Sequence, residues 1–138
     1  MMRGLVARLP GVVAALWWGS LSTTGFLVVP LLFKHLATPA IAGAMAARLF
    51  TAQTWVSMAC ALLLLMASRS ARSPETAARV HDALPFVLTG LLLALLAEFG
   101  VAPRIVARDN LALWHAVGSG MYLLQWISAA VVLWRLQR

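Results

Sequence analysis

The sequence predicts an all-α membrane protein, a four-transmembrane-helix bundle, from three observations: long uncharged stretches, helix-start signals between them and a one-sided distribution of basic residues. No Asp, Glu, Lys or Arg occurs in residues 9–33, 49–68, 83–97 or 110–134. A helix needs ~20 mostly apolar residues to cross ~30 Å of hydrocarbon. Three stretches meet this length, and the third in order meets it only if Glu98 lies inside the membrane.

The start signals place the helices in order within a single four-span domain, residues 1–138. Thr38-Pro39 and Ser73-Pro74 each give a capping residue followed by a proline at the first helical position, and Asp109 or Asn110 caps the last helix. We expect the first span to remain uncleaved, because its apolar run exceeds the about 7–15 residues of a signal-peptide core; cleavage at the small-residue stretch 37–40 is the alternative. The predicted spans are about 11–33, 43–67, 83–103 and 111–135.

Basic residues predict the orientation. One side of the membrane receives Arg3, Arg8, Arg69, Arg72, Arg79, Arg135 and Arg138, and the other receives Lys34, Arg104 and Arg108. Short loops with the larger basic count remain cytoplasmic. We therefore expect a multi-pass protein of the bacterial inner (plasma) membrane with both termini in the cytoplasm. The net charge of +7 is then explained by topology, so the lipid bilayer is the predicted partner and nucleic acid is not.

A short internal repeat suggests two hairpins in parallel orientation. Phe26-Leu27-Val28-Val29-Pro30 ends the first span, and Phe99-Gly100-Val101-Ala102-Pro103 ends the third. Chance recurrence in an apolar sequence is the other explanation. Small residues at four-residue spacing predict close helix packing; these are Gly11, Ala15, Gly19 and Thr23, then Gly43, Ala47 and Thr51, then Gly90 and Ala94.

Two charges inside the spans require an explanation. Arg48 and Glu98 both lie in the outer half of the predicted bilayer, where an unpaired charge costs at least about 2.5–3.5 kcal/mol. The simplest prediction is an ion pair between the second and third helices. Two alternatives remain: the pair only fixes helix register, or each side chain reaches separately toward the headgroups.

A polar face on the last span points to the same depth. His115, Ser119 and Tyr122 share one face at helical spacing. Together with Arg48 and Glu98 they predict an outer-facing polar cavity that binds a small ligand. The alternative for His115 is a simple hydrogen bond to a neighbouring helix.

Metal and haem sites are further alternatives. His115, His35 and Glu98, with Met45, offer imidazole, carboxylate and thioether ligands, a mixture that suits copper. A haem held by His35 and His115 would lie at the outer edge of the bundle. No metal-ligand spacing supports either site. No phosphate loop, nucleophile–base pair or paired carboxylates are present, so we expect no enzyme.

Three stretches carry a family resemblance: WWGSLSTTGFLVVPLLFKHL, AGAMAARLF and LWHAVGSGMYLLQWI. They resemble the domain-of-unknown-function 4149 family, which is related to transmembrane protein 205 and distantly similar to copper-resistance-type membrane proteins. The matching positions are Trp17, Gly19, Pro30, Phe33, Leu36, Gly43, Leu49, Phe50, His115, Gly118 and Ser119. Tyr122-Leu123 stands where the family usually has Asn-Leu. The resemblance implies a four-span fold without an established activity, and it adds some support to the metal alternative.

The predicted function is therefore a small, non-enzymatic membrane protein with a ligand-binding or metal-binding cavity. The alternative is a structural or accessory subunit, which docks other membrane proteins or a second copy of itself through its small-residue grooves.

Overall fold

The computed structural model confirms the all-α fold. It describes residues 2–70 and 73–138, with the side chains of residues 2–7 omitted, and Arg72 of the orientation count lies outside it. Four continuous helical segments are long and apolar enough to cross a membrane: Arg8–His35, Pro39–Ser70, Pro74–Val106 and Leu111–Gln137. The elements in order are α1 (Met2–Thr23), η1 (Thr24–Val28), α2 (Val29–His35), α3 (Pro39–Ser70), α4 (Pro74–Leu96), η2 (Ala97–Val101), α5 (Ala102–Val106) and α6 (Leu111–Gln137).

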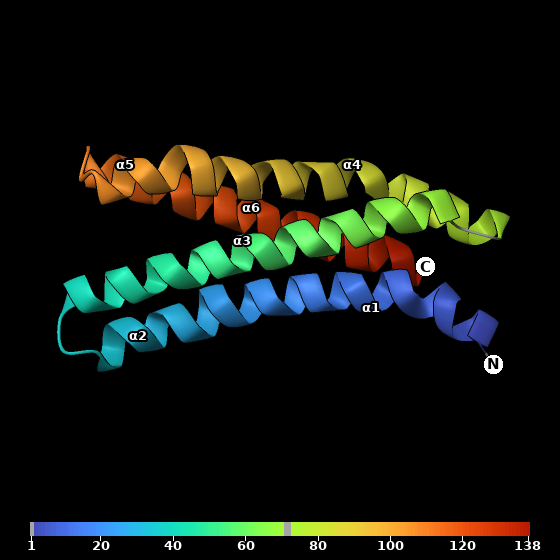
Figure 1. Cartoon of the computed structure of the whole chain (residues 1–138), viewed down its shortest axis with the longest axis horizontal. Helices are drawn as coiled ribbons and strands as arrows, with labels where there is room; N and C mark the ends of the chain where they lie inside the picture. The colour runs from blue at the N-terminus through green and yellow to red at the C-terminus, as the bar shows by residue number, and fades with distance from the viewer. Residues whose placement is uncertain (1, 71–72) are drawn as a thin grey trace.

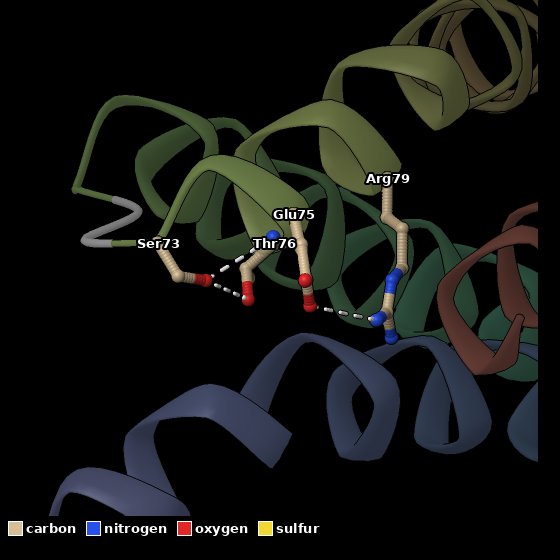
Figure 2. A network of polar contacts seen from close by, with 4 residues as sticks. All are labelled: Ser73, Glu75, Thr76 and Arg79. Carbon is tan, nitrogen blue, oxygen red and sulfur yellow. Dashed lines mark hydrogen bonds and ion pairs between the residues drawn. The ribbon is translucent and has the colours of Figure 1, made fainter.

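The helix starts follow the signals in the sequence. Thr38 Oγ1 accepts a hydrogen bond from the Ile41 amide at 3.3 Å, and Asn110 Oδ1 accepts one from Leu113 at 3.4 Å. At the start of α4, Ser73 Oγ accepts from the Thr76 amide at 3.2 Å, as Figure 2 shows. These side chains satisfy backbone donors that no helical carbonyl reaches.

The two copies of the Phe-x-Val-x-Pro repeat adopt the same local structure. Each forms a π-helical turn, η1 or η2, in which a backbone amide bonds five residues back: Val29 to Thr24, and Ala102 to Ala97. In both spans a proline lies two residues after the end of the turn, at Pro30 and at Pro103. Proline donates no hydrogen bond and its ring crowds the carbonyl four residues before it, so a wider turn relieves the clash. The repeat therefore encodes a matched distortion in both hairpins.

The helices form a ring. The helices α1 and α4 each pack on both α3 and α6. Both termini lie at one end of the bundle, and the α2–α3 connection lies at the other (Figure 1). We call these the terminal end and the loop end.

The core fills the terminal half of the bundle. Its fully buried side chains include Trp17, Leu21, Leu64, Val80, Val87 and Val132. Trp17 lies directly against Gly90 of α4, where an added Cβ would be 2.7 Å from the indole Cη2. Here a small residue allows close packing, as predicted. Gly11 and Gly19 differ, because nothing lies within 4 Å of an added Cβ at either position. Their stripe on α1 is not packed inside the bundle.

Candidate functional site

A large cavity occupies the loop half of the bundle. Its volume is about 870 Å³, and all four membrane-spanning segments contribute to its walls. The walls are mostly apolar, with Phe26, Phe33 and Val101 among the lining residues. The polar lining residues are Arg48, Thr51, Gln53, Thr54, Glu98, His115, Ser119, Tyr122 and Gln125. The sequence-based set Arg48, Glu98, His115, Ser119 and Tyr122 is thus placed around one space.

The ion pair predicted between Arg48 and Glu98 is not formed. Glu98 instead accepts a hydrogen bond from Thr51 Oγ1 at 2.8 Å, which joins η2 to α3. Within the described residues, the ion pair present joins Arg79 to Glu75 at 3.8 Å, far along the chain at the start of α4 (Figure 2). Arg48 has no hydrogen bond or ion pair with the part of the chain that the structure describes.

Tyr122 connects α6 to the first span, where it contacts the end of α1 and the π-helical turn η1. Its hydroxyl donates a hydrogen bond to the Leu21 carbonyl at 2.7 Å. Its ring lies so close to Gly25 that an added Cβ there would be 3.0 Å from Tyr122 Cζ. Phe50 packs edge-on against the same ring at 5.3 Å between centroids. Tyr122 therefore holds α6 against the first span in the cavity wall, and its hydroxyl is already hydrogen-bonded to the Leu21 carbonyl.

Two buried glutamines of the site were not predicted from the sequence. Gln53 and Gln125 line the cavity although they are only 5% and 4% exposed. Each follows an aromatic residue, Phe50 or Tyr122, by three positions, and each lies on the second helix of its hairpin. That shared spacing is the signal that would have found them, because it extends the repeat into the second helix.

The glutamines separate the cavity from the packed core. Gln53 donates to Ser20 Oγ at 2.9 Å and accepts from Thr24 Oγ1 at 3.1 Å. Gln125 donates to Ser57 Oγ at 2.9 Å. Amides that bond to neighbouring helices in this way satisfy polar groups that lipid cannot. They form a polar layer across the bundle.

The predicted metal site is not assembled. His115 and Glu98 line the cavity, but His35 is an exposed residue at the end of α2 and is not part of the lining. In residues 2–70 and 73–138 no group of three or more His, Cys, Asp or Glu side chains is arranged to hold a metal ion. The copper site of His35, His115 and Glu98 is therefore not supported by the structure. The haem alternative likewise has no cavity shared by its two histidines.

A second hollow, of about 230 Å³, lies at the terminal end. Arg8 of α1 and Arg79 and Thr76 of α4 contribute to its walls. Figure 2 shows Arg79 reaching toward α1 beside the exposed Glu75 carboxylate. This hollow is small and charged, whereas the cavity of the loop half is large and mostly apolar.

One comparison with known proteins gives a match. Residues 12–112 match the family described as Domain of unknown function (DUF4149). This region includes α3 and η2, which carry Arg48, Thr51 and Glu98, and it ends at the start of α6, before His115. No curated protein and no solved structure matches the chain. Since the match covers most of the chain, the protein belongs to the DUF4149 family.

Proposed function

We propose that this protein is a non-enzymatic membrane protein that binds a small amphipathic molecule in the cavity of its loop half. The observation that carries the proposal is the cavity itself, whose volume of about 870 Å³ lies within the about 300–1,000 Å³ of typical ligand pockets. Its lining combines aromatic and aliphatic side chains with a limited set of polar groups. Such a surface suits a molecule with an apolar body and one polar end.

The arrangement of the polar residues supports binding over catalysis. An activated nucleophile needs a base within hydrogen-bond reach. His115 and Ser119 lie on the same face of α6, yet no hydrogen bond joins His115 to Ser119 or to Glu98. The Glu98 carboxylate is held by Thr51, and the Tyr122 hydroxyl by the Leu21 carbonyl.

The cavity faces the outside in this proposal. The terminal end carries more basic residues than the loop end, and the basic side remains cytoplasmic. Reporter fusions after residues 38 and 73 test this orientation in the bacterial inner membrane. Alkaline phosphatase is expected to be active after residue 38, and green fluorescent protein is expected to fluoresce after residue 73. The reverse result would move the cavity to the cytoplasmic side.

A cavity-filling variant tests the binding function. Gly43 lines the cavity, and nothing lies within 4 Å of an added Cβ there. Gly43→Phe therefore adds a ring to the cavity without a backbone clash. Gly120→Phe is the matched control, because Gly120 is equally unobstructed but lies outside the cavity. Native mass spectrometry of gently purified protein reports bound mass.

We expect bound amphiphile on the wild type and on Gly120→Phe, with occupancy at least halved on Gly43→Phe. Equal occupancy on all three proteins would contradict a ligand site in this cavity.

One observation favours the alternative function, docking to other membrane helices. The Gly11–Gly19 stripe on α1 is unobstructed rather than packed within the bundle. The same mass spectra distinguish the two functions, since docking adds the mass of a protein partner or of a second copy. Gly19→Leu would remove that mass and leave a bound small molecule in place.

A further inference from the structure

We infer that the ligand of the cavity is an anionic amphiphile, with an acidic group on an apolar chain, and that Arg48 binds the acidic group. This inference rests on the proposed function and adds the charge of the ligand. It comes from the different situations of the two charged residues, Arg48 and Glu98, that line one cavity.

Arg48 is a permanent cation without a partner. It lies about 14 Å from the start of α3, counted from Pro39 at 1.5 Å per residue, and it lines the cavity. A guanidinium does not lose its proton in proteins, so this side chain cannot lower its energy by becoming neutral. It needs either an anion or water. Among the described residues, no carboxylate lies within ion-pair distance of it.

Glu98 does not have the same need. One of its oxygens accepts the Thr51 hydrogen bond at 2.8 Å, so the chain already compensates part of its charge. Of the two charges, Arg48 is therefore the one left without a partner for a ligand to bind.

The surroundings favour an anion as well. Glu98 is the one acidic residue among those lining the cavity, and His115 is the remaining ionisable nitrogen base there. Beyond the lining, Lys34, Arg104 and Arg108 lie at the same end of the bundle, against a single carboxylate, Asp109. Excess positive charge at this end of the bundle attracts anions. A guanidinium also matches the planar oxygens of a carboxylate or phosphate.

The apolar walls define the rest of the ligand. Phe26, Phe33 and Val101 line the space around the polar groups, and its volume greatly exceeds that of a small inorganic anion. A free phosphate or acetate ion would leave most of these walls uncovered. An acidic headgroup on a hydrocarbon chain fills both parts of the site.

The test compares probes that share one chain and differ in headgroup charge. Dodecanoate, 1-dodecanol and dodecyltrimethylammonium are titrated against the wild type in a non-ionic detergent at mildly alkaline pH, and binding is measured by native mass spectrometry. We expect dodecanoate to bind about tenfold or more tightly than dodecanol, as a charge-assisted hydrogen bond implies. Acetate and inorganic phosphate, which lack the chain, are expected to bind far more weakly.

Variants assign the charge preference to Arg48. Arg48→Gln is expected to reduce dodecanoate affinity about tenfold and to leave dodecanol unchanged, and Arg48→Lys is expected to lie between wild type and Arg48→Gln. Arg104→Gln is the control, because Arg104 lies at the same end but over the Trp114 ring, 4.3 Å from its centroid, and outside the cavity lining. Its effect is expected to be below about twofold, since an exposed charge outside the lining is screened by solvent.

The outcomes separate this inference from the proposed function. Equal binding of the three dodecyl probes, or an unchanged dodecanoate affinity in Arg48→Gln, overturns the inference. If Gly43→Phe still reduces binding in that case, the cavity remains a ligand site for neutral molecules. If Gly43→Phe binds every probe as the wild type does, the proposed function fails as well. If acetate or phosphate binds as tightly as dodecanoate, the ligand does not need an apolar chain, and the cavity is a site for small anions.

Discussion

The two halves of the bundle are built from the same four helices but are packed in opposite ways. In the terminal half, Trp17, Leu21 and Leu64 are fully buried among close-packed helices. In the loop half, the helices surround a cavity of about 870 Å³ and carry two π-helical turns. Lipid is as apolar as a leucine side chain, so close packing rather than the hydrophobic effect holds membrane helices together. The terminal half therefore supplies the stability of the bundle, and the loop half can enclose a cavity.

The polar groups show the same contrast. In the loop half and the layer above it, hydroxyls and amides bond across helices, as Gln53 does to Ser20 and Gln125 does to Ser57. In the terminal half, the buried indole nitrogens of Trp17 and Trp18 have no hydrogen-bond partner among the described residues. At these two positions the packing of the large indole rings outweighs the cost of leaving their N–H donors without a hydrogen bond. The amides that border the cavity are thus hydrogen-bonded across helices, whereas these two buried indoles contribute to packing alone.

The largest expected effect tests the packed half. Trp17→Ala removes a side chain that is 0% exposed and leaves a void between α1 and α4. We expect the free energy of unfolding to fall by about 2–3 kcal/mol, less than in a water-soluble core because lipid replaces part of the lost contact. Sodium dodecyl sulfate titration in mixed micelles, followed by circular dichroism, measures the change.

Trp55→Ala is the control for this substitution. It removes the same side chain from a position that is 61% exposed, where a loss below about 0.5 kcal/mol is expected. Similar losses at Trp17 and Trp55 would mean that the terminal half is not the stabilising half.

A smaller effect tests the contact between Gly25 and the Tyr122 ring. Gly25→Ala places a methyl group against the Tyr122 ring, so we expect a loss of about 1–2 kcal/mol as the ring and helix move apart. Gly43→Ala meets nothing within 4 Å and removes the helix penalty of glycine, so it is expected to stabilise by about 0.4–1 kcal/mol. The same titration measures both. Opposite signs at these two glycines sharpen the comparison, and a stabilising Gly25→Ala would show that Tyr122 does not fasten α6 there.

The fold was predictable because the sequence separates its charges from its apolar residues. Uncharged stretches located the spans, and Thr38, Ser73 and Asn110 located three helix starts. Positions within one regular helix could also be grouped, and His115, Ser119 and Tyr122, which were grouped on one face, all line the cavity. Spacing on a straight helix is enough for such assignments.

The remaining site could not be predicted for two physical reasons. His35 lies beyond the π-helical turn Thr24–Val28, where an extra residue per turn rotates every later side chain, so its direction cannot be extrapolated from α1. Thr51 was predicted to belong to a packing stripe with Gly43 and Ala47, and the sequence does not tell whether a carboxylate on another helix meets its hydroxyl or the guanidinium of Arg48. The structure brings it to the hydroxyl. Gln53 and Gln125 were overlooked because an uncharged amide interrupts no apolar stretch.

The smallest expected effect concerns the two charged residues of the loop half, Arg48 and Glu98. Since Glu98 bonds to Thr51 and Arg48 has no partner in the described chain, Arg48→Ala is expected to leave the free energy of unfolding of the ligand-free protein unchanged or slightly higher. A double-mutant cycle of Arg48→Ala with Glu98→Ala should give a coupling energy below about 0.5 kcal/mol, whereas a buried pair gives about 0.5–3. The cycle of Thr51→Val with Glu98→Ala is the internal standard and should give about 0.5–1.5 kcal/mol, the range of hydrogen bonds between membrane helices. A coupling of Arg48 with Glu98 larger than that of Thr51 with Glu98 would restore the ion pair. It would also remove the unpaired cation on which the proposed recognition of an anionic ligand depends, so this small energy decides whether Arg48 is available to such a ligand or is held in a salt bridge.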